Sequence, residues 1–231
     1  MENTYSNWTS SDAKRRSKDE LQEKVVGNFL DKYYYSTFTT SIKRNTDKET
    51  QIKGLDLTIT STNNNTYTID EKAAVKWANK GLMTFAFEVD SLDKNGNLYN
   101  GWLMTNTAIN DYWLLTWIDS ATTADFTSVD ELKAVTVALV KKTDLYNWMH
   151  KKHITGEALK QAAIDLRTNF NYNNGCTYTR INGLKVTIQP NVCEHATNIL
   201  LPRTALINEI ATYSASVTDK GITPIKRNIG I

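Results

Sequence analysis

The chain has 231 residues, of which 40% are hydrophobic and 23% are charged, and its formal net charge at pH 7 is +2. It has no apolar run of about eighteen residues, which excludes a membrane-spanning helix, and its polar start has no apolar signal segment. We therefore expect a cytoplasmic protein without membrane contact. The net charge is too small to argue for or against nucleic acid, because an acidic metal site would offset a local basic surface.

The two cysteines, Cys176 and Cys193, are expected to be free thiols in a reducing compartment. Together with His150, His153 and His195 they could suggest zinc, but their spacing lacks the paired short intervals of structural zinc sites. The chain also shows no internal repeat and no long linker. We therefore expect one domain over residues 1–231.

The first predicted element is a helix over residues 11–33, with Ser10 or Ser11 as its cap. Its apolar residues recur at helical spacing and predict one buried face: Leu21, Val25, Val26, Phe29, Leu30 and Tyr33. Strands are predicted next, over residues 38–43, 51–60 and 66–75. The last two flank an Asn-rich turn at 62–65 and are predicted to form a β-hairpin.

Further strands are predicted over residues 82–89 and 112–118, with a turn at 93–96 whose Asn-Gly pair tolerates positive φ. Residues 132–140 could be strand or helix, and their β-branched side chains favour strand. Helices at 143–150 and from Thr155 to 168, a hairpin at 178–188 and a final helix beginning near Pro202 complete the prediction. The fold class is α+β, or α/β-like, with a mixed sheet.

Charged residues interrupt two of these strands at positions that favour burial. Asp56 lies within the predicted strand 51–60, and Asp70 and Lys72 lie in the next strand. Because strand side chains alternate, Asp70 and Lys72 share a face, and Glu71 points to the other. A hairpin can place Asp56 beside Asp70. Two clustered carboxylates require a cation between them, and oxygen ligands suit Mg²⁺.

This pattern, Asp56 followed by Asp70-x-Lys72 on the next strand, resembles the bipartite motif of the PD-(D/E)xK nuclease superfamily. Leu55 stands where the motif name has proline. The resemblance covers about residues 17–89, with residues 112–118 as a later core strand. It implies a restriction-endonuclease-like core within residues 11–120, built from a helix, a three-stranded meander, a further helix and another strand. Helices would flank the central sheet, and residues 121–231 would be a C-terminal elaboration of unknown role.

The resemblance also implies functions for individual residues. Asp56, Asp70 and the backbone carbonyl of Glu71 would bind Mg²⁺ or Mn²⁺, and Lys72 would act on the attacking water. Glu23, on the first helix, would complete the metal shell, with Glu20 as the fallback. The implied reaction is hydrolysis of phosphodiester bonds in nucleic acid, with DNA as the first expectation, by a metal-activated water. A homodimer is compatible with this family.

Two other interpretations stay open. Asp70 and Lys72 could simply pair on a solvated sheet face, where such pairs contribute roughly 0–1 kcal/mol. The chain could also be a non-catalytic module of the same fold that binds nucleic acid or a protein. The basic residues at the start of the first helix could bind phosphates or could simply be solvated: Lys14, Arg15, Arg16 and Lys18.

Overall fold

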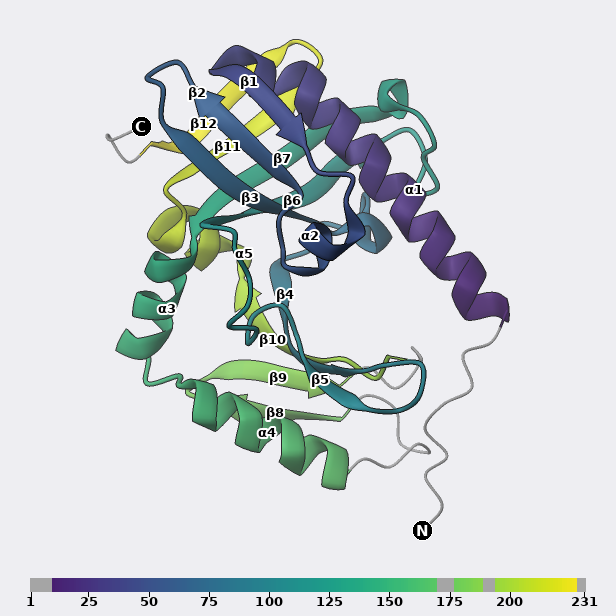
Figure 1. Cartoon of the computed structure of the whole chain (residues 1–231), viewed down its shortest axis with the longest axis vertical. Helices are drawn as coiled ribbons and strands as arrows, with labels where there is room; N and C mark the ends of the chain where they lie inside the picture. The colour runs from purple at the N-terminus through teal and green to yellow at the C-terminus, as the bar shows by residue number, and fades with distance from the viewer. Residues whose placement is uncertain (1–9, 170–176, 189–193, 228–231) are drawn as a thin grey trace. The chain divides into compact units, whose positions relative to one another are not determined.

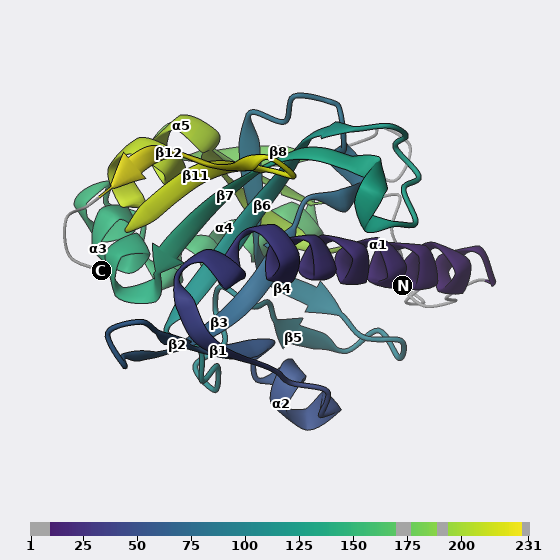
Figure 2. The same ribbon diagram turned by 90° about the horizontal axis from the view of Figure 1, so that it is seen from above.

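The computed structural model describes residues 10–169, 177–188 and 194–227, and these form two compact units, each assembled from several segments of the chain. The larger unit takes its described residues from 17–83, 107–146 and 203–227, and the smaller from 10–16, 84–106 and 147–202. The segments of the two units alternate along the chain, and neither unit coincides with residues 11–120. Figures 1 and 2 show the elements of both units.

The larger unit is built on a seven-stranded mixed sheet in the order β1-β2-β3-β6-β7-β11-β12. All neighbouring pairs are antiparallel except β3 and β6, which run parallel. The strands are β1 (Thr39–Arg44), β2 (Leu57–Ser61), β3 (Thr66–Ala73), β6 (Tyr112–Ala121), β7 (Leu132–Lys141), β11 (Tyr213–Thr218) and β12 (Gly221–Arg227). The fold class is therefore α+β with a mixed sheet, as predicted.

Helix α1 (Ser10–Tyr33) covers one face of this sheet with the part that belongs to the larger unit (Figure 2). Val25, Val26, Phe29 and Leu30 are buried in the core that the helix shares with the strands, and Tyr33 packs against it, as predicted. Leu21 is an exception, because it is 47% exposed. Its neighbour Gln22 is buried instead, and its side chain donates a 2.9 Å hydrogen bond to the Ala124 carbonyl. These contacts fix how the helix lies on the sheet.

The segment 51–60 is not one continuous strand. Helix α2 (Lys48–Ile52) begins after Asp47, whose carboxylate accepts a 2.9 Å hydrogen bond from the Thr50 N–H. Gly54 then adopts a φ of 71°, a left-handed conformation that turns the chain into β2. The strand therefore begins at Leu57, and the alternating apolar pattern did not reveal that Asp47 is the N-cap of a helix before it.

The connection from β3 to β6 differs from the predicted core. Residues 74–111 are all described, and they contain the 3₁₀ turn η2 (Val75–Trp77) and strands β4 (Thr84–Leu92) and β5 (Leu98–Asn100), but no α-helix. The helix that the family resemblance places between the meander and the next strand is therefore absent from this connection. Strand β6 still runs parallel to β3.

The smaller unit contains a five-stranded antiparallel sheet in the order β5-β4-β10-β9-β8. Its remaining strands are β8 (Tyr178–Ile181), β9 (Leu184–Ile188) and β10 (Thr197–Pro202). Helix α4 (Gly156–Thr168) packs against this sheet, and Thr155 caps it by accepting a 3.1 Å hydrogen bond from the Ala158 N–H. Asp90 and Arg167 form an ion pair at 2.5 Å inside the unit.

Several other sequence predictions are confirmed. Residues 132–140 are strand, α3 (Lys142–Lys151) covers the predicted helix 143–150, and the hairpins turn at the predicted sites. Pro202 precedes a short α5 (Arg203–Ala205), which continues as the π-helix η5 (Leu206–Ile210). The other short turns are η1 (Tyr35–Thr37) and η3 (Val129–Glu131). Within the described ranges, no helix has both the length and the apolar composition that a membrane crossing requires.

Candidate active site

Asp56 lies immediately before β2 and not within a strand as predicted, but it is still brought close to Asp70 on β3. Leu57 pairs with Ile69, and the Asp56 N–H donates a 3.0 Å hydrogen bond to the carbonyl of the same Ile69, so the regular ladder ends at this pair and is irregular at Asp56. The two side chains nevertheless lie close together, because the Asp56 carboxyl shares a hydrogen bond with Asp70 and is affected by its charge. The Asp56 carboxylate accepts a 2.7 Å hydrogen bond from the Glu71 N–H, which fixes its orientation.

Asp70 and Lys72 lie on the same face of β3, as the alternation predicts, and their side chains form an ion pair at 2.7 Å. This pair is not on a solvated sheet surface. The Asp70 side chain is only 3% exposed and that of Lys72 is 29% exposed. Burying a carboxylate is costly unless it has a partner. The burial of Asp70 therefore excludes the interpretation of this pair as a solvated surface contact.

The pKa of Asp56 is raised to about 6. Burial is the largest cause, and repulsion from the Asp70 charge and a hydrogen bond with Asp70 add to it. The Lys72 charge and the Glu71 N–H act in the opposite direction. The two aspartates therefore share a site that favours an added positive charge.

Lys72 stays protonated at this site. Burial lowers the pKa of its ammonium group, but the charges of Asp70 and Asp56 and the hydrogen bond to Asp70 outweigh that effect and raise the pKa overall. Lys72 therefore acts as a fixed cation next to the two carboxylates and is not poised to act as a neutral base.

Glu23 lies on a stripe of α1 whose other residues contact Lys76, which comes after β3, and Arg44 on β1. Residues 19, 23, 27 and 31 are spaced by four and share one side of the helix. Asp19 forms a 3.1 Å ion pair with Lys76, while the Gly27 carbonyl and Asp31 bind Arg44. Glu23 lies between these two anchors. Glu20 is one position off this stripe.

The electrostatics agree with that placement of Glu23. Desolvation raises the pKa of its carboxyl, the charge of Lys72 opposes the shift, and the charge of Asp56 adds to it. The Glu23 side chain is exposed, so solvent weakens these effects. Glu23 thus shares the electrostatic environment of the aspartates without a direct bond to them among the described contacts.

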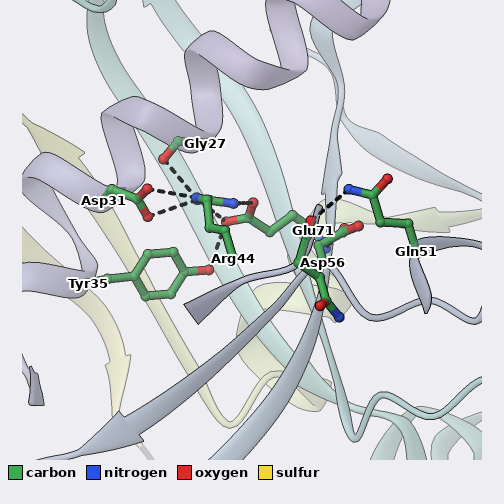
Figure 3. A network of polar contacts seen from close by, with 8 residues as sticks. Gly27, Asp31, Tyr35, Arg44, Gln51, Asp56 and Glu71 are labelled. Carbon is green, nitrogen blue, oxygen red and sulfur yellow. Dashed lines mark hydrogen bonds and ion pairs between the residues drawn. The ribbon is translucent and has the colours of Figure 1, made fainter. Parts of the chain in front are cut away.

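Glu71 points to the opposite face of β3, as predicted, but it is not a surface residue. Its carboxylate accepts hydrogen bonds from Arg44 at 2.7 Å and from the Tyr35 hydroxyl at 2.9 Å. Arg44 also binds both carboxylate oxygens of Asp31, at 2.7 and 2.9 Å (Figure 3). This network ties α1 to β1 and β3. It holds the backbone of Glu71, whose N–H binds Asp56.

Two residues near Asp70 were not singled out from the sequence: Asn110 and Lys142. A Cβ at Gly54 would lie 3.1 Å from the Asn110 Oδ1 and 3.3 Å from the Asp70 Oδ2, so both oxygens face the glycine. Asn110 is 4% exposed, and its amide donates a 2.9 Å hydrogen bond to the Tyr112 carbonyl. The positive φ of Gly54 and the burial of Asn110 could be related to the aspartates only once the arrangement of the strands was known.

The donor set fits a hard divalent cation. Within the described ranges, no group of three or more His, Cys, Asp or Glu side chains is arranged as a metal site. Mg²⁺, however, commonly uses one or two protein carboxylates and keeps several waters or substrate oxygens. Asp56 and Asp70 supply two carboxylates, and the raised pKa of Asp56 is caused by burial and by Asp70. The chemistry of the site thus suits Mg²⁺ or Mn²⁺.

The remaining candidates lie elsewhere. Cys176 and Cys193 lie outside the described residues, and His150, His153 and His195 belong to the smaller unit. Arg15 forms a 2.9 Å ion pair with Glu194. Lys18 pairs with Asp125 at 2.5 Å on the surface.

Comparison of the chain with protein-family models, with curated proteins and with solved structures found no match.

Proposed function

We propose that this protein is a metal-dependent nuclease that hydrolyses phosphodiester bonds in nucleic acid, with DNA as the first candidate substrate. The observation that carries the proposal is the close approach of the Asp56 and Asp70 carboxyl groups, with Lys72 against Asp70 at 2.7 Å and Asp70 almost fully buried. Two clustered carboxylates with a single lysine between them, one of them almost fully buried, are costly to a fold, so a functional reason is favoured.

The order of elements supports a restriction-endonuclease-like core. Helix α1 precedes the meander β1-β2-β3, and β6 lies parallel to β3. The site occupies the second hairpin of that meander, where the PD-(D/E)xK resemblance expects it. The connection through β4 and β5, in place of a helix, would be a departure specific to this chain.

Asp56, Asp70 and the Glu71 carbonyl would hold Mg²⁺ or Mn²⁺, and Glu23, on α1, would complete the shell. The bound cation would polarise the phosphate and make water a better nucleophile. Lys72, kept charged by Asp70, would orient the attacking water and stabilise negative charge on the pentacoordinate phosphorus. The Glu71 N–H holds the Asp56 carboxylate in position for this reaction.

The test is cleavage of supercoiled plasmid and of single-stranded DNA by the wild type, Asp70→Ala and Asp125→Ala, with Mg²⁺, Mn²⁺ or EDTA. Asp125 is a matched control, because its exposed carboxylate also pairs with a lysine. We expect metal-dependent cleavage that falls at least about a hundredfold in Asp70→Ala and is unchanged in Asp125→Ala. Thermal unfolding checks that both variants fold. Wild-type rates in a folded Asp70→Ala would refute this mechanism.

One observation favours a second candidate, a non-catalytic binding module on the same fold. The Lys72 ammonium already neutralises Asp70 directly, so the buried carboxylate has a partner within the chain. Divalent metal distinguishes the two functions. A nuclease site should raise the melting temperature on addition of Mg²⁺ or Mn²⁺ and lose that response in Asp56→Asn, whereas a binding module should show no response in either protein.

A further inference from the structure

Lys142 lies close to the aspartates although it is distant from them in sequence. Its Nζ lies 5.6 Å from the centre of the Trp113 ring, and Trp113 is the cross-strand partner of Asp70. The charge of Asp70 acts on the Lys142 ammonium. The larger unit therefore brings a second lysine to the face that carries Asp70 and Lys72.

The register places the two lysines on opposite sides of Asp70 along the strands. Asp70, Trp113 and Val140 form one row across β3, β6 and β7. Lys72 lies two residues after Asp70 on β3, in the row with Leu115 and Ala138. Because β7 runs antiparallel to β3 and β6, Lys142 lies beyond Val140 in the other direction. Its N–H donates a 3.0 Å hydrogen bond to the Asp111 carbonyl, which continues the ladder.

Neutral oxygens hold the Lys142 ammonium. It donates to the Ala108 carbonyl at 3.3 Å and to the Asn110 Oδ1 at 3.5 Å. Both bonds are long, and an ammonium has three donors. Among the ion pairs of the described residues none includes Lys142. Asn110 is buried, and its bond to the Tyr112 carbonyl aims the amide oxygen at the lysine. The ammonium is thus held in place with capacity for an anionic partner.

We propose that Lys142 binds a phosphate of the nucleic-acid strand next to the scissile phosphate, and that Asn110 positions it. This inference rests on the proposed nuclease function. A nucleic-acid strand could cross the row of Asp70, Trp113 and Val140 with its scissile phosphate beside Lys72. A neighbouring phosphate of that strand would then lie near Lys142, on the other side of the row. A phosphate contact from a lysine acts as a point charge and carries no sequence information.

The test compares Lys142→Met, Lys142→Arg and Lys141→Met with the wild type. Methionine keeps an apolar stem over Trp113 and removes the charge. Lys141 is the matched control, since it is adjacent, exposed and on the opposite face of β7. Binding of fluorescein-labelled duplex DNA, single-stranded DNA and single-stranded RNA is measured in EDTA by anisotropy over a series of salt concentrations. KM and kcat are measured for whichever form the wild type cleaves, and melting temperatures control for folding.

For Lys142→Met we expect binding weakened about tenfold and the slope of log Kd against log salt reduced by about one. KM should rise more than kcat falls, Lys142→Arg should retain most of the binding, and Lys141→Met should match the wild type. A purely structural role would lower the melting temperature without changing the salt slope, and that result overturns the inference.

Two further outcomes separate this inference from the function on which it rests. If the wild type cleaves nucleic acid and Lys142→Met behaves like Lys141→Met, only the role of Lys142 is wrong. If the wild type neither binds nor cleaves any of the three probes, or the plasmid, both proposals fail together.

Discussion

At the scale of single residues, the Asp56 carboxylate accepts a hydrogen bond from the Glu71 N–H and also faces the negative charge of Asp70. Its pKa is about 6 in the folded chain against an ordinary value of 3.8. Between these two pH values the folded chain holds a proton that the unfolded chain has released. The stabilisation from this proton is therefore complete below about pH 3.8 and is lost as the pH rises through about 6.

Asp56→Asn should consequently stabilise the metal-free protein at neutral pH. The amide oxygen can still accept the Glu71 N–H, while the repulsion from Asp70 disappears. We expect the free energy of unfolding in EDTA at pH 7.5 to rise by on the order of 1–3 kcal/mol, with cleavage lost in Mg²⁺. Urea unfolding at pH 7.5 and at pH 4 measures this, and the difference from the wild type should shrink toward pH 4.

Asp125→Asn provides the comparison, because that carboxylate lies on the surface and pairs with Lys18. It should change the free energy of unfolding by less than about 1 kcal/mol at either pH. An Asp56→Asn variant that is less stable than the wild type at pH 7.5 would show that the carboxylate contributes more through its hydrogen bond than it costs through repulsion.

At the scale of secondary-structure elements, the Arg44 network connects the frame of the fold to the candidate site. Arg44 on β1 joins Asp31 and the Gly27 carbonyl on α1 to Glu71 on β3 (Figure 3). Gly27 has no Cβ, and one there would lie 3.2 Å from the guanidinium, so a larger residue at this position would make the arginine shift by a few tenths of an ångström. The network is therefore part of how α1 and β3 are held together.

Removing Arg44 should leave the largely buried Glu71 carboxylate with only the Tyr35 hydroxyl. We expect Arg44→Met to lower the free energy of unfolding by about 2–4 kcal/mol, less than a fully buried pair would cost because the Arg44 side chain is 30% exposed. Arg44→Met combined with Glu71→Gln should recover part of that loss. Equilibrium unfolding of the two single variants and the double variant measures the coupling, and strictly additive losses would contradict it.

Local signals were enough to predict many of the elements and the central pairing of the site. The hairpin over residues 57–73 follows from strand alternation around an Asn-rich turn, and the same alternation places Asp70 and Lys72 on one face. The cap of α2 at Asp47 was missed because Leu55, Leu57 and Ile59 alternate at strand spacing and the predicted strand was extended back over Ile52. Asn110 and Lys142 could not be predicted, because their proximity to Asp70 depends on the parallel pairing of β3 with β6, a non-local contact.

At the scale of the whole molecule, the chain leaves the larger unit after residue 83 and after residue 146, and returns to it at residues 107 and 203. Strands β7, β11 and β12 complete the sheet that carries the candidate site, although they lie in the segment 121–231 that the sequence suggested was an elaboration. Core residues from both parts of the sequence, such as Leu57, Ile69, Val135 and Val217, pack in one cluster. A boundary near residue 120 would cut through this core.

A fragment of residues 11–120 should therefore fail to fold. It would expose the β6 edge that pairs with β7, along with Trp113, Leu114 and Trp117, which are at most 2% exposed in the full chain. An unpaired apolar strand edge promotes aggregation. We expect the full chain to unfold cooperatively by circular dichroism and the fragment to show no thermal transition and to aggregate. A soluble fragment with a cooperative transition and Mg²⁺-dependent cleavage would instead mean that β7, β11 and β12 only extend a core that is already sufficient.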